Sequence, residues 1–323
     1  MHRYFLGVDG GQSSTTAVIG DEHGNIAGWA SAGPCNHVSA AEAKEKFLRV
    51  FGECLSQAGT RAGLSQSGSE QARRWPFQSA CLGMSGGPAD KASLLAGLIE
   101  AEHLNVTDDA TIALAGATSG KPGIVVIAGT GSIAFGQNAR GEAARAGGWG
   151  YIYGDEGSAF DIVRQALRAI VREHEGWGGR TALTPALLEP AGAGDANELL
   201  HAFYTPVWPR QRVAALAPVV NRIAEDGDPI AIGILENAGH ELAMLAAAVR
   251  RQLWPENAAM RVAWVGGAFQ SSILLERFRA LVTLDDNTAC GPPEHGPAIG
   301  ALLLAYRAAG VPFTPTSASA ADR

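Results

Sequence analysis

One supersecondary plan occurs twice in this sequence, and this repetition constrains the fold more than any other feature. From Tyr4 onward, the strand-like "YFLGVD" is followed by the turn "GGQSST", a second strand "TAVIG", a polar turn, and a third strand beginning "IAGWA". Residues 123–145 repeat this order as "GIVVIA", "GTGS", "IAFG", "QNARGE" and "AARAG". Short strands joined by glycine-rich and polar turns are typical of an antiparallel meander. The repeat therefore predicts two similar halves.

Helical periodicity is present in the rest of each half. Apolar residues recur at three- and four-residue spacing in residues 157–173 and 229–254, a pattern that favours helices with one buried face. Further helix is expected near residues 39–58 and in parts of 193–224, and strands are expected at "SACLGM" and "RVAWVGG". Strands mixed with helices in each half predict an α/β protein with two lobes and a cleft between them.

The lobe boundary is expected just before the second copy of the repeat. The N-terminal lobe is predicted to span residues 1–119 and the C-terminal lobe, which is richer in helix, residues 120–307. Residues 308–323 end in the small and polar "TPTSASAADR", which is typical of a disordered tail.

Composition argues against several classes of function. The 323 residues carry a net charge of −7 without a dense cluster of Lys and Arg, which argues against nucleic acid or an anionic membrane as the main partner. No apolar run approaches the roughly 20 residues that span a bilayer, and the first residues lack the apolar core of a secretion signal. We therefore expect a cytoplasmic protein. The four cysteines are scattered without a Cys-x-x-Cys pair, a pattern that favours buried small residues over disulfides or metal ligands.

Two glycine-rich stretches resemble nucleotide motifs but fail on spacing or context. In "GATSGKPG", only three residues separate Gly116 from Gly120, and Pro122 stands where a Walker loop needs Ser or Thr. "GTGSIAFG" lacks the helix that a dinucleotide-binding fingerprint requires, because "IAFGQN" has the pattern of a strand.

The remaining candidates are the two turns of the repeat, "DGGQSST" at residues 9–15 and "GTGS" at residues 129–132. Such turns present main-chain N–H groups and Ser/Thr hydroxyls, which suit phosphate oxygens. One turn in each lobe predicts a site for a polyphosphate. Asp9 would supply an oxygen ligand to the magnesium ion that normally accompanies a nucleoside triphosphate.

A third segment, "GGWGYIYGDEGSAF" at residues 147–160, places glycines around Trp149, Asp155 and Glu156. Glycine lets a ligand approach the main chain closely, so this segment is a candidate site for a polar ligand. The simpler alternative is a tight helix start capped by the two acids.

Together, these motifs resemble the BadF/BadG/BcrA/BcrD ATPase family of the sugar kinase, chaperone and actin superfamily, and the resemblance covers nearly all of residues 4–307. "GVDGGQSSTTAVIGDEHG" and "VVIAGTGSIAFG" resemble the two phosphate motifs, and "VAWVGGAFQSS" resembles the adenosine motif. Residues 147–160 resemble the segment that is distinctive of the family's N-acetylglucosamine kinases. The resemblance implies two ribonuclease-H-like lobes of the actin-like ATPase fold, with extra helices in the second lobe, and a homodimer.

The resemblance also implies the site residues, with ATP and Mg²⁺ as cofactors and Asp9 as the metal-binding acid. The residues implied to contact the sugar are Asn36, Asp109, Gly148, Trp149, Gly150 and Asp155. The residues implied to bind the nucleotide are Gly10, Gly11, Ser13, Gly129, Thr130, Gly131, Gly267 and Ser271.

Transfer of a phosphoryl group to a hydroxyl usually needs an acid that accepts the hydroxyl proton. "VTDDATIAL" offers Asp108 and Asp109 at the start of a helical pattern, where capping is the competing role. The family's Asp-Ala pair aligns with Asp109 and Ala110, so we predict Asp109 as the catalytic base, with Asp108 as the alternative.

These features predict an ATP-dependent kinase that phosphorylates the 6-hydroxyl of N-acetylglucosamine, with glucosamine or another amino sugar as the alternative substrate. The sequence departs at Ile133 from the family's vertebrate N-acetylglucosamine kinases, whose Gly-Thr-Gly-Ser motif continues with a sugar-binding asparagine. Ile133 either offers apolar surface to an acetyl group or packs in the core as a strand residue.

Two other functions within the superfamily are less well supported. An ATP-driven activator of a dehydratase or reductase would need cluster-binding cysteines shared across a dimer, and no suitable cysteine motif is present. An actin- or chaperone-like switch protein would need a further substrate or polymer module, whereas the second half ends soon after the nucleotide motifs.

Overall fold

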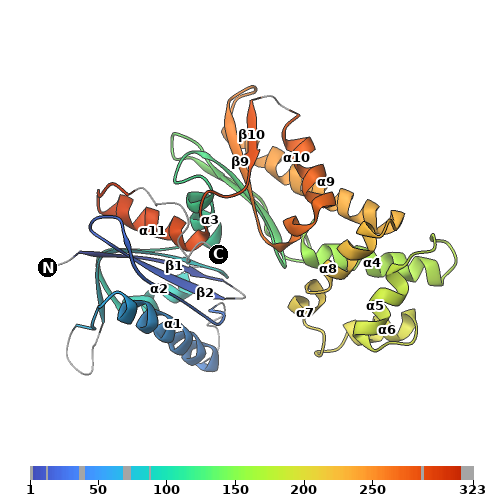
Figure 1. The fold of residues 1–323 in the computed structure, drawn as a ribbon, viewed down its shortest axis with the longest axis horizontal. Coiled ribbons are helices and arrows are strands. Elements are labelled where there is room, and N and C mark those ends of the chain that lie inside the picture. The colour runs from blue at the N-terminus through green and yellow to red at the C-terminus, as the bar shows by residue number, and fades with distance from the viewer. Residues whose placement is uncertain are drawn as a thin grey trace. The chain divides into compact units, whose positions relative to one another are not determined.

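The computed structural model describes residues 3–11, 14–35, 41–67, 74–86, 89–284 and 287–313 (Figure 1). The chain divides into two compact units. The first unit comprises Met1–Lys121 together with Pro293–Arg323, and the second comprises Pro122–Pro292.

The first unit is built on a five-stranded sheet in the order β3-β2-β1-β4-β5. Its strands are β1 (Tyr4–Gly10), β2 (Thr15–Asp21), β3 (Ile26–Ala32), β4 (Trp75–Met84) and β5 (Ile99–Thr107). The first three strands pair antiparallel, while β1–β4 and β4–β5 pair parallel. This register places Asp9 opposite Gly83 at the carboxyl ends of β1 and β4.

Helices cover both faces of this sheet. Its helices are α1 (Ala41–Arg61), α2 (Ala89–Ala96), α3 (Asp109–Ala117) and α11 (Pro297–Ala308). Figure 1 shows α1 below the sheet and α11 above it, in agreement with two separate apolar clusters. On the α11 side, Phe5 of β1 stacks on Tyr306 with ring centroids 4.0 Å apart. Burial on both faces explains why β1 reads as a continuous apolar run.

The second unit repeats the same plan in the order β10-β9-β6-β7-β8. Its strands are β6 (Gly123–Ala128), β7 (Ser132–Gln137), β8 (Ala143–Gly147), β9 (Met260–Val265) and β10 (Thr288–Gly291). The first three form an antiparallel meander, and β9 and β10 join it in parallel. The prediction of two similar α/β lobes is therefore confirmed.

The second unit carries the larger set of helices. They are α4 (Ala159–His174), α5 (Leu183–Ala191), α6 (Ala196–Phe203), α7 (Arg210–Ala214), α8 (Ala217–Glu225), α9 (Pro229–Leu253) and α10 (Ser272–Val282), with the short 3₁₀ helix η1 (Gly267–Gln270). One apolar cluster joins the sheet to α4 and α9 and continues into α5, α6 and α8. The expected extra helices are thus present in the second lobe.

The structure differs from the sequence-based division at the C-terminus. Residues 120–307 were expected to form the second lobe, but α11 belongs to the first unit, where it packs on β1 and α3. Residues 308–323 were expected to be a disordered tail, yet Phe313 stacks on Tyr306 with centroids 4.3 Å apart. Residues 314–323 lie outside the described residues. Chain order alone could not reveal that the last helix returns to the first sheet.

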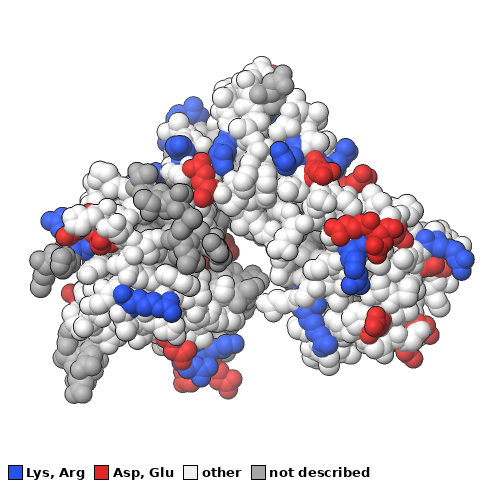
Figure 2. Space-filling view, viewed as in Figure 1, with Lys and Arg blue, Asp and Glu red and all other residues white. Residues whose placement is uncertain are grey.

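Charges are dispersed over the described residues on the face that Figure 2 shows. Lys/Arg and Asp/Glu side chains occur there in small groups of both signs, separated by uncharged surface. No described helix combines the length and apolar character needed to cross a membrane.

Candidate functional site

The first unit places two predicted acids where strand and helix ends meet. Asp9 is the next-to-last residue of β1, and Asp109 is the first residue of α3. The carboxyl of Asp109 is close enough to influence the ionisation of Asp9. Gly10 and Gly11 follow Asp9 directly, and Gly11 closes the turn with a main-chain hydrogen bond from its N–H to the Ser14 carbonyl at 2.9 Å. Ser13 and Asn36 lie outside the described residues.

Asp108 and Asp109 have different environments. Asp108 has extended backbone angles and accepts a hydrogen bond from the Thr111 N–H at 2.8 Å, so it is the N-cap of α3. Asp109 is exposed at the first helical position. The capping role that was expected for one of the two acids therefore belongs to Asp108, which leaves the Asp109 carboxyl available for a substrate.

Both acids have raised pKa values. Burial, followed by the charge of Asp109, raises the pKa of Asp9 to about 6. Partial desolvation of the carboxyl by the surrounding protein, followed by the charge of Asp108, raises the pKa of Asp109. The residue as a whole remains accessible to solvent. A hydrogen bond from Ser85 opposes this rise. A carboxyl with a raised pKa is a better proton acceptor, as a catalytic base must be.

Ser85 and Lys91 complete this region, and the sequence analysis did not single them out. Lys91 of α2 is 1% exposed and donates from Nζ to the Ser85 carbonyl at 2.9 Å. Burial lowers the pKa of Lys91, while the nearby Asp90 and Asp109 oppose that shift. The available signal was the spacing of α2, because Lys91 lies four residues before the buried Leu95 and so shares its buried face.

Asp9 and Asp109 suit a magnesium ion that keeps most of its coordinated water molecules. Among the described residues, no group of three or more His, Cys, Asp or Glu side chains could hold a metal ion. Mg²⁺ is commonly bound by one or two carboxylates together with substrate phosphates and waters. The charge of Asp109 raises the pKa of Asp9, so a cation bound at Asp9 would relieve this repulsion. The residues present therefore fit Mg²⁺ at Asp9.

In the second unit, the other phosphate turn is joined to the glycine-rich segment. Gly129 and Gly131 close the turn through a main-chain hydrogen bond of 2.9 Å. The Ala159 N–H, at the start of α4, donates to the Gly129 carbonyl at 2.9 Å. The Ser132 hydroxyl donates to the Glu156 carbonyl at 2.6 Å. These bonds hold the predicted phosphate turn against the predicted sugar segment.

The glycine-rich segment begins beside Ile133. Gly148 has a φ of +72°, and a Cβ at this position would lie 2.8 Å from Cδ1 of Ile133. Ile133 therefore lies directly against a predicted sugar-binding residue. Trp149 is 66% exposed with the Arg145 guanidinium 5.0 Å from its ring centroid, and a Cβ on Gly150 would meet open space. These residues are accessible to a ligand.

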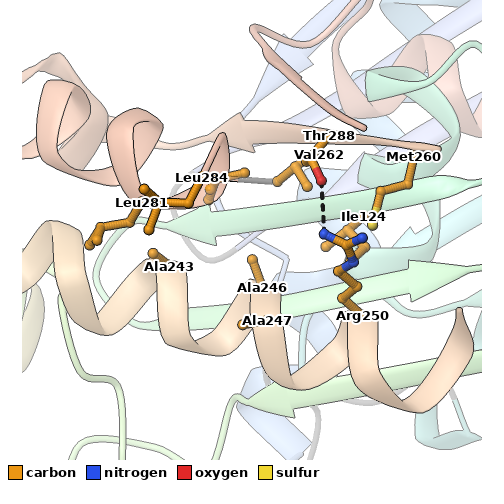
Figure 3. Close-up of a pocket in the computed structure, with 11 residues that line it drawn as sticks. Ile124, Ala243, Ala246, Ala247, Arg250, Met260, Val262, Leu281, Leu284 and Thr288 are labelled. Atoms are coloured by element: carbon orange, nitrogen blue, oxygen red, sulfur yellow. Dashed lines mark hydrogen bonds between the residues drawn. The ribbon is translucent and has the colours of Figure 1, made fainter. Parts of the chain in front are cut away.

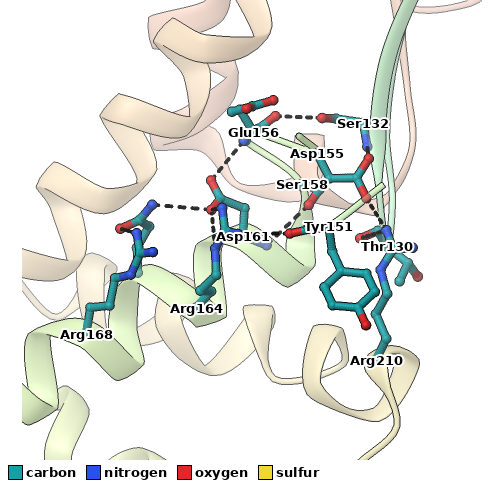
Figure 4. A network of polar contacts seen from close by, with 12 residues as sticks. Thr130, Ser132, Tyr151, Asp155, Glu156, Ser158, Asp161, Arg164, Arg168 and Arg210 are labelled. Carbon is teal, nitrogen blue, oxygen red and sulfur yellow. Dashed lines mark hydrogen bonds and ion pairs between the residues drawn. The ribbon is translucent and has the colours of Figure 1, made fainter. Parts of the chain in front are cut away.

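Asp155 belongs to the polar network in Figure 4, where its carboxylate lies between Ser132 and Arg210. It is 3% exposed and has a φ of +65°, a left-handed conformation that is uncommon for a residue other than glycine. The Ser132 N–H donates to its Oδ1 at 3.3 Å, and the Arg210 guanidinium donates to its Oδ2. Arg210 is a residue that the sequence analysis did not single out.

The predicted adenosine motif ends next to the second phosphate turn. Gly266 lies directly against the carbonyl of Ala128, the residue that precedes the turn. A Cβ on Gly267 would meet no atom within 4 Å, so its surface is open. The Ser271 hydroxyl accepts from the Leu274 N–H at 3.3 Å as the N-cap of α10, and its side chain is buried. Gly267 is thus open to a ligand, whereas Ser271 already serves the helix.

The pocket in Figure 3 is separate from these residues. It has a volume of about 150 Å³ and lies between α9 and the first residues of β6, β9 and β10, with Ile124, Met260 and Thr288 in its lining. The phosphate turn follows the other end of β6. None of the predicted site residues lines this pocket.

The repeated sheet order, with a glycine turn after the first strand of each unit, defines the actin-like ATPase fold. The chain matches the BadF/BadG/BcrA/BcrD ATPase family over residues 6–305 and belongs to it. This confirms the resemblance noted in the sequence.

Two curated relatives are sugar kinases. An N-acetylmuramic acid/N-acetylglucosamine kinase of Clostridium acetobutylicum is 30% identical over 289 residues, which cover 88% of this chain and 91% of the relative. An N-acetyl-D-glucosamine kinase of Dictyostelium discoideum is 30% identical over 328 residues, which cover 93% of this chain and 97% of the relative. A Chromobacterium violaceum protein of known crystal structure, provisionally named an N-acetylglucosamine kinase, is 28% identical with a TM-score of 0.74, covering 94% of this chain and 98% of that one.

Proposed function

We propose that this protein is an ATP-dependent amino-sugar kinase that transfers the γ-phosphoryl group to the 6-hydroxyl of N-acetylglucosamine. Membership of the ATPase family over residues 6–305 supports the use of ATP. The names of the two curated relatives support an amino sugar as the acceptor. The structural observation that carries the proposal is the exposed Asp109 carboxyl, with its raised pKa, at the start of α3.

In this reaction Asp109 accepts the proton of the attacking hydroxyl, and a base with a raised pKa makes that transfer more favourable. Asp9 has a pKa of about 6, so it is mostly ionised at neutral pH and can hold Mg²⁺ directly or through water. The metal ion would neutralise charge on the phosphate oxygens. The main-chain N–H groups of the two glycine turns, with Ser13 and Thr130, would bind the phosphates, and Gly267 would meet the nucleotide.

The sugar would be bound by Asn36 together with Gly148, Trp149, Gly150 and Asp155. Trp149 offers an exposed ring, and Asp155 offers a carboxylate that keeps acceptor capacity beside its two present donors. Ile133 places apolar surface against Gly148. Such a surface suits an acetyl methyl, whereas the ammonium of glucosamine would lose hydration beside it. This favours the acetylated sugar.

An activator of a dehydratase or reductase is a less suitable assignment. Cys35, Cys54 and Cys81 are buried, and Cys290 is partly buried. Burial raises the pKa of Cys54 to about 11 and of Cys81 to about 12, which disfavours the thiolate forms that bind metal clusters. These four cysteines are therefore poor candidates for ligands of a metal cluster shared across a dimer.

An ADP-release assay with a panel of sugars tests the proposal. We expect ATP turnover with N-acetylglucosamine and none without sugar, and no turnover with 6-deoxy-N-acetylglucosamine, which lacks the accepting hydroxyl. Glucosamine, N-acetylmannosamine, N-acetylmuramic acid and glucose complete the panel, and phosphorus NMR of the product locates the phosphate. Turnover of the 6-deoxy sugar would refute the 6-hydroxyl as the acceptor. ATP turnover that does not depend on sugar would refute the assignment as a sugar kinase.

A further inference from the structure

An arginine from a different helix holds the carboxylate of Asp155. Arg210 is the first residue of α7 and lies 55 residues after Asp155 in the sequence. Its Nη2 group donates both to Asp155 Oδ2 and to the Thr130 carbonyl, the latter at 3.1 Å. One guanidinium nitrogen therefore connects the predicted sugar segment to the predicted phosphate turn, as Figure 4 shows.

The guanidinium is itself held in place by neighbouring rings. It lies 5.3 Å from the ring centroid of Tyr151 and 5.8 Å from that of Phe160. Tyr151 and Phe160 also contact each other edge to face, with centroids 5.3 Å apart. A guanidinium packed against two rings loses little entropy when it makes a hydrogen bond, because its rotamer is already restricted.

Gly131 leaves room for this ion pair. A Cβ at Gly131 would lie 2.7 Å from Nη2 of Arg210 and 2.9 Å from both carboxylate oxygens of Asp155. Any side chain here would have to displace the pair. Gly131, the second glycine of the phosphate turn, is therefore required by the Asp155–Arg210 contact, in addition to any phosphate that approaches the turn.

A buried carboxylate in a left-handed backbone conformation needs such support. Asp155 is 3% exposed, and removing one partner from a buried pair leaves an uncompensated charge that can reorient or rehydrate. Its two oxygens each accept one hydrogen bond here and keep capacity for another. Arg210 and the Ser132 N–H thus fix the direction in which the remaining acceptor positions point.

We propose that Arg210 is a positioning residue that orients Asp155 toward the sugar and ties that orientation to the phosphate turn at Thr130. The proposal rests on the proposed function, because it takes Asp155 as a sugar ligand. It adds a residue that no motif contains, and assigns the effect of Arg210 on sugar binding to Asp155 rather than to a direct contact.

Steady-state kinetics and sugar binding by calorimetry test this on the full chain. Arg210→Gln is expected to raise both the KM and the Kd for the sugar by about tenfold or more, since a hydrogen bond to a charged group is lost. Arg210→Lys keeps the cation and should show a smaller rise. Gly131→Ala should resemble Arg210→Gln.

Arg212→Gln is the matched control. Arg212 is on the same helix but contacts Trp208 and the Val207 carbonyl. The sugar KM of Arg212→Gln should therefore stay within about twofold of wild type.

The combination with Asp155→Asn separates positioning from simple structural support. If Arg210 acts through Asp155, the double variant should have the same sugar KM as Asp155→Asn alone, whereas independent effects would multiply. A sugar KM within about twofold of wild type in Arg210→Gln, with only the melting temperature lowered, would overturn the proposal. So would multiplicative losses in the double variant. Should Arg210→Gln not fold, Arg210→Lys and its combination with Asp155→Asn give the same comparison.

The proposed function and this inference can fail separately. If the wild-type chain phosphorylates no sugar in the panel, the proposed function fails. A double-mutant cycle on the free energy of unfolding still measures the coupling between positions 210 and 155, and an absence of coupling would refute the pair itself.

Discussion

The carboxylate of Asp108 accepts a hydrogen bond from the Thr111 N–H at 2.8 Å, so this acid caps α3 while its neighbour Asp109 remains exposed. Two adjacent acids thereby have different environments, which agrees with the prediction that one of them caps the helix. The cap occupies one oxygen of Asp108 and fixes its side chain toward the helix, whereas Asp109 is oriented by the helix backbone.

Substitution of each acid by its amide distinguishes the two roles. Asp109→Asn should fold and bind sugar but lose turnover by about 10² or more, the usual contribution of a positioned general base. Asp108→Asn should keep turnover within a few-fold, because asparagine is as good an N-cap as aspartate. Single-turnover kinetics checks both variants. Near-normal turnover in Asp109→Asn, with a collapse in Asp108→Asn, would transfer the role of base to Asp108.

Asp9 is expected to lower stability at neutral pH. Its pKa is about 6 in the folded chain, against an ordinary value of 3.8. Between these two pH values the folded chain binds more protons at Asp9 than the unfolded chain, so this group makes stability fall as the pH rises through that window. Asp9→Asn should therefore raise the free energy of unfolding at pH 7 by about 1–3 kcal/mol, and much less near pH 4.

Urea unfolding at both pH values measures this difference. Asp226→Asn is the control, because Asp226 is an exposed residue at the end of α8 and should behave like wild type. A loss of stability in Asp9→Asn at pH 7 would mean that the carboxylate is stabilised by an interaction other than those that raise its pKa.

Sequence motifs predicted the parts of the site that are local in the chain. Turn residues and helical periodicity are short-range signals. They were sufficient to find the two glycine turns, the segment at residues 147–160 and the helix α4 that follows this segment. β5 was missed, since it is an edge strand with several exposed polar residues, including Glu102 and His103, and shows little apolar alternation.

The residues that support the site could not be found in the same way. Arg210 contacts Asp155 across 55 residues of sequence, and Lys91 donates to the Ser85 carbonyl from the buried face of α2. In the sequence, each of these residues looks like an ordinary surface charge on a short helix. Their roles depend on tertiary contacts, which no local pattern specifies.

Ser85 should tune the ionisation of the proposed base. Its hydrogen bond to Asp109 lowers the pKa of that carboxyl, so Ser85→Ala should raise the pKa further. A larger share of Asp109 is then protonated at a given pH, and the acid limb of the kcat/KM profile should move to higher pH. Ser93→Ala is the matched control, because Ser93 is exposed on α2. An unchanged acid limb in Ser85→Ala would show that another group controls it.

Ile133 offers a test of substrate choice. The resemblance implies a sugar-binding asparagine here in the family's vertebrate N-acetylglucosamine kinases. In this chain Ile133 lies against Gly148, where a Cβ would be 2.8 Å from the Cδ1 of Ile133. If this side chain faces the sugar, Ile133→Asn gains about one neutral hydrogen bond and should lower the KM for N-acetylglucosamine by about threefold to tenfold. It should also reduce the preference over glucosamine, because the apolar contact that suits the acetyl methyl is lost. Ile133→Leu, which keeps the apolar surface, should change neither this KM nor the preference for the acetylated sugar.

Two outcomes would contradict this account. An equal rise in KM for both sugars in Ile133→Asn would identify Ile133 as a packing residue of β7. A wild-type kcat/KM that is higher for glucosamine than for N-acetylglucosamine would overturn the choice of sugar while leaving the kinase assignment in place.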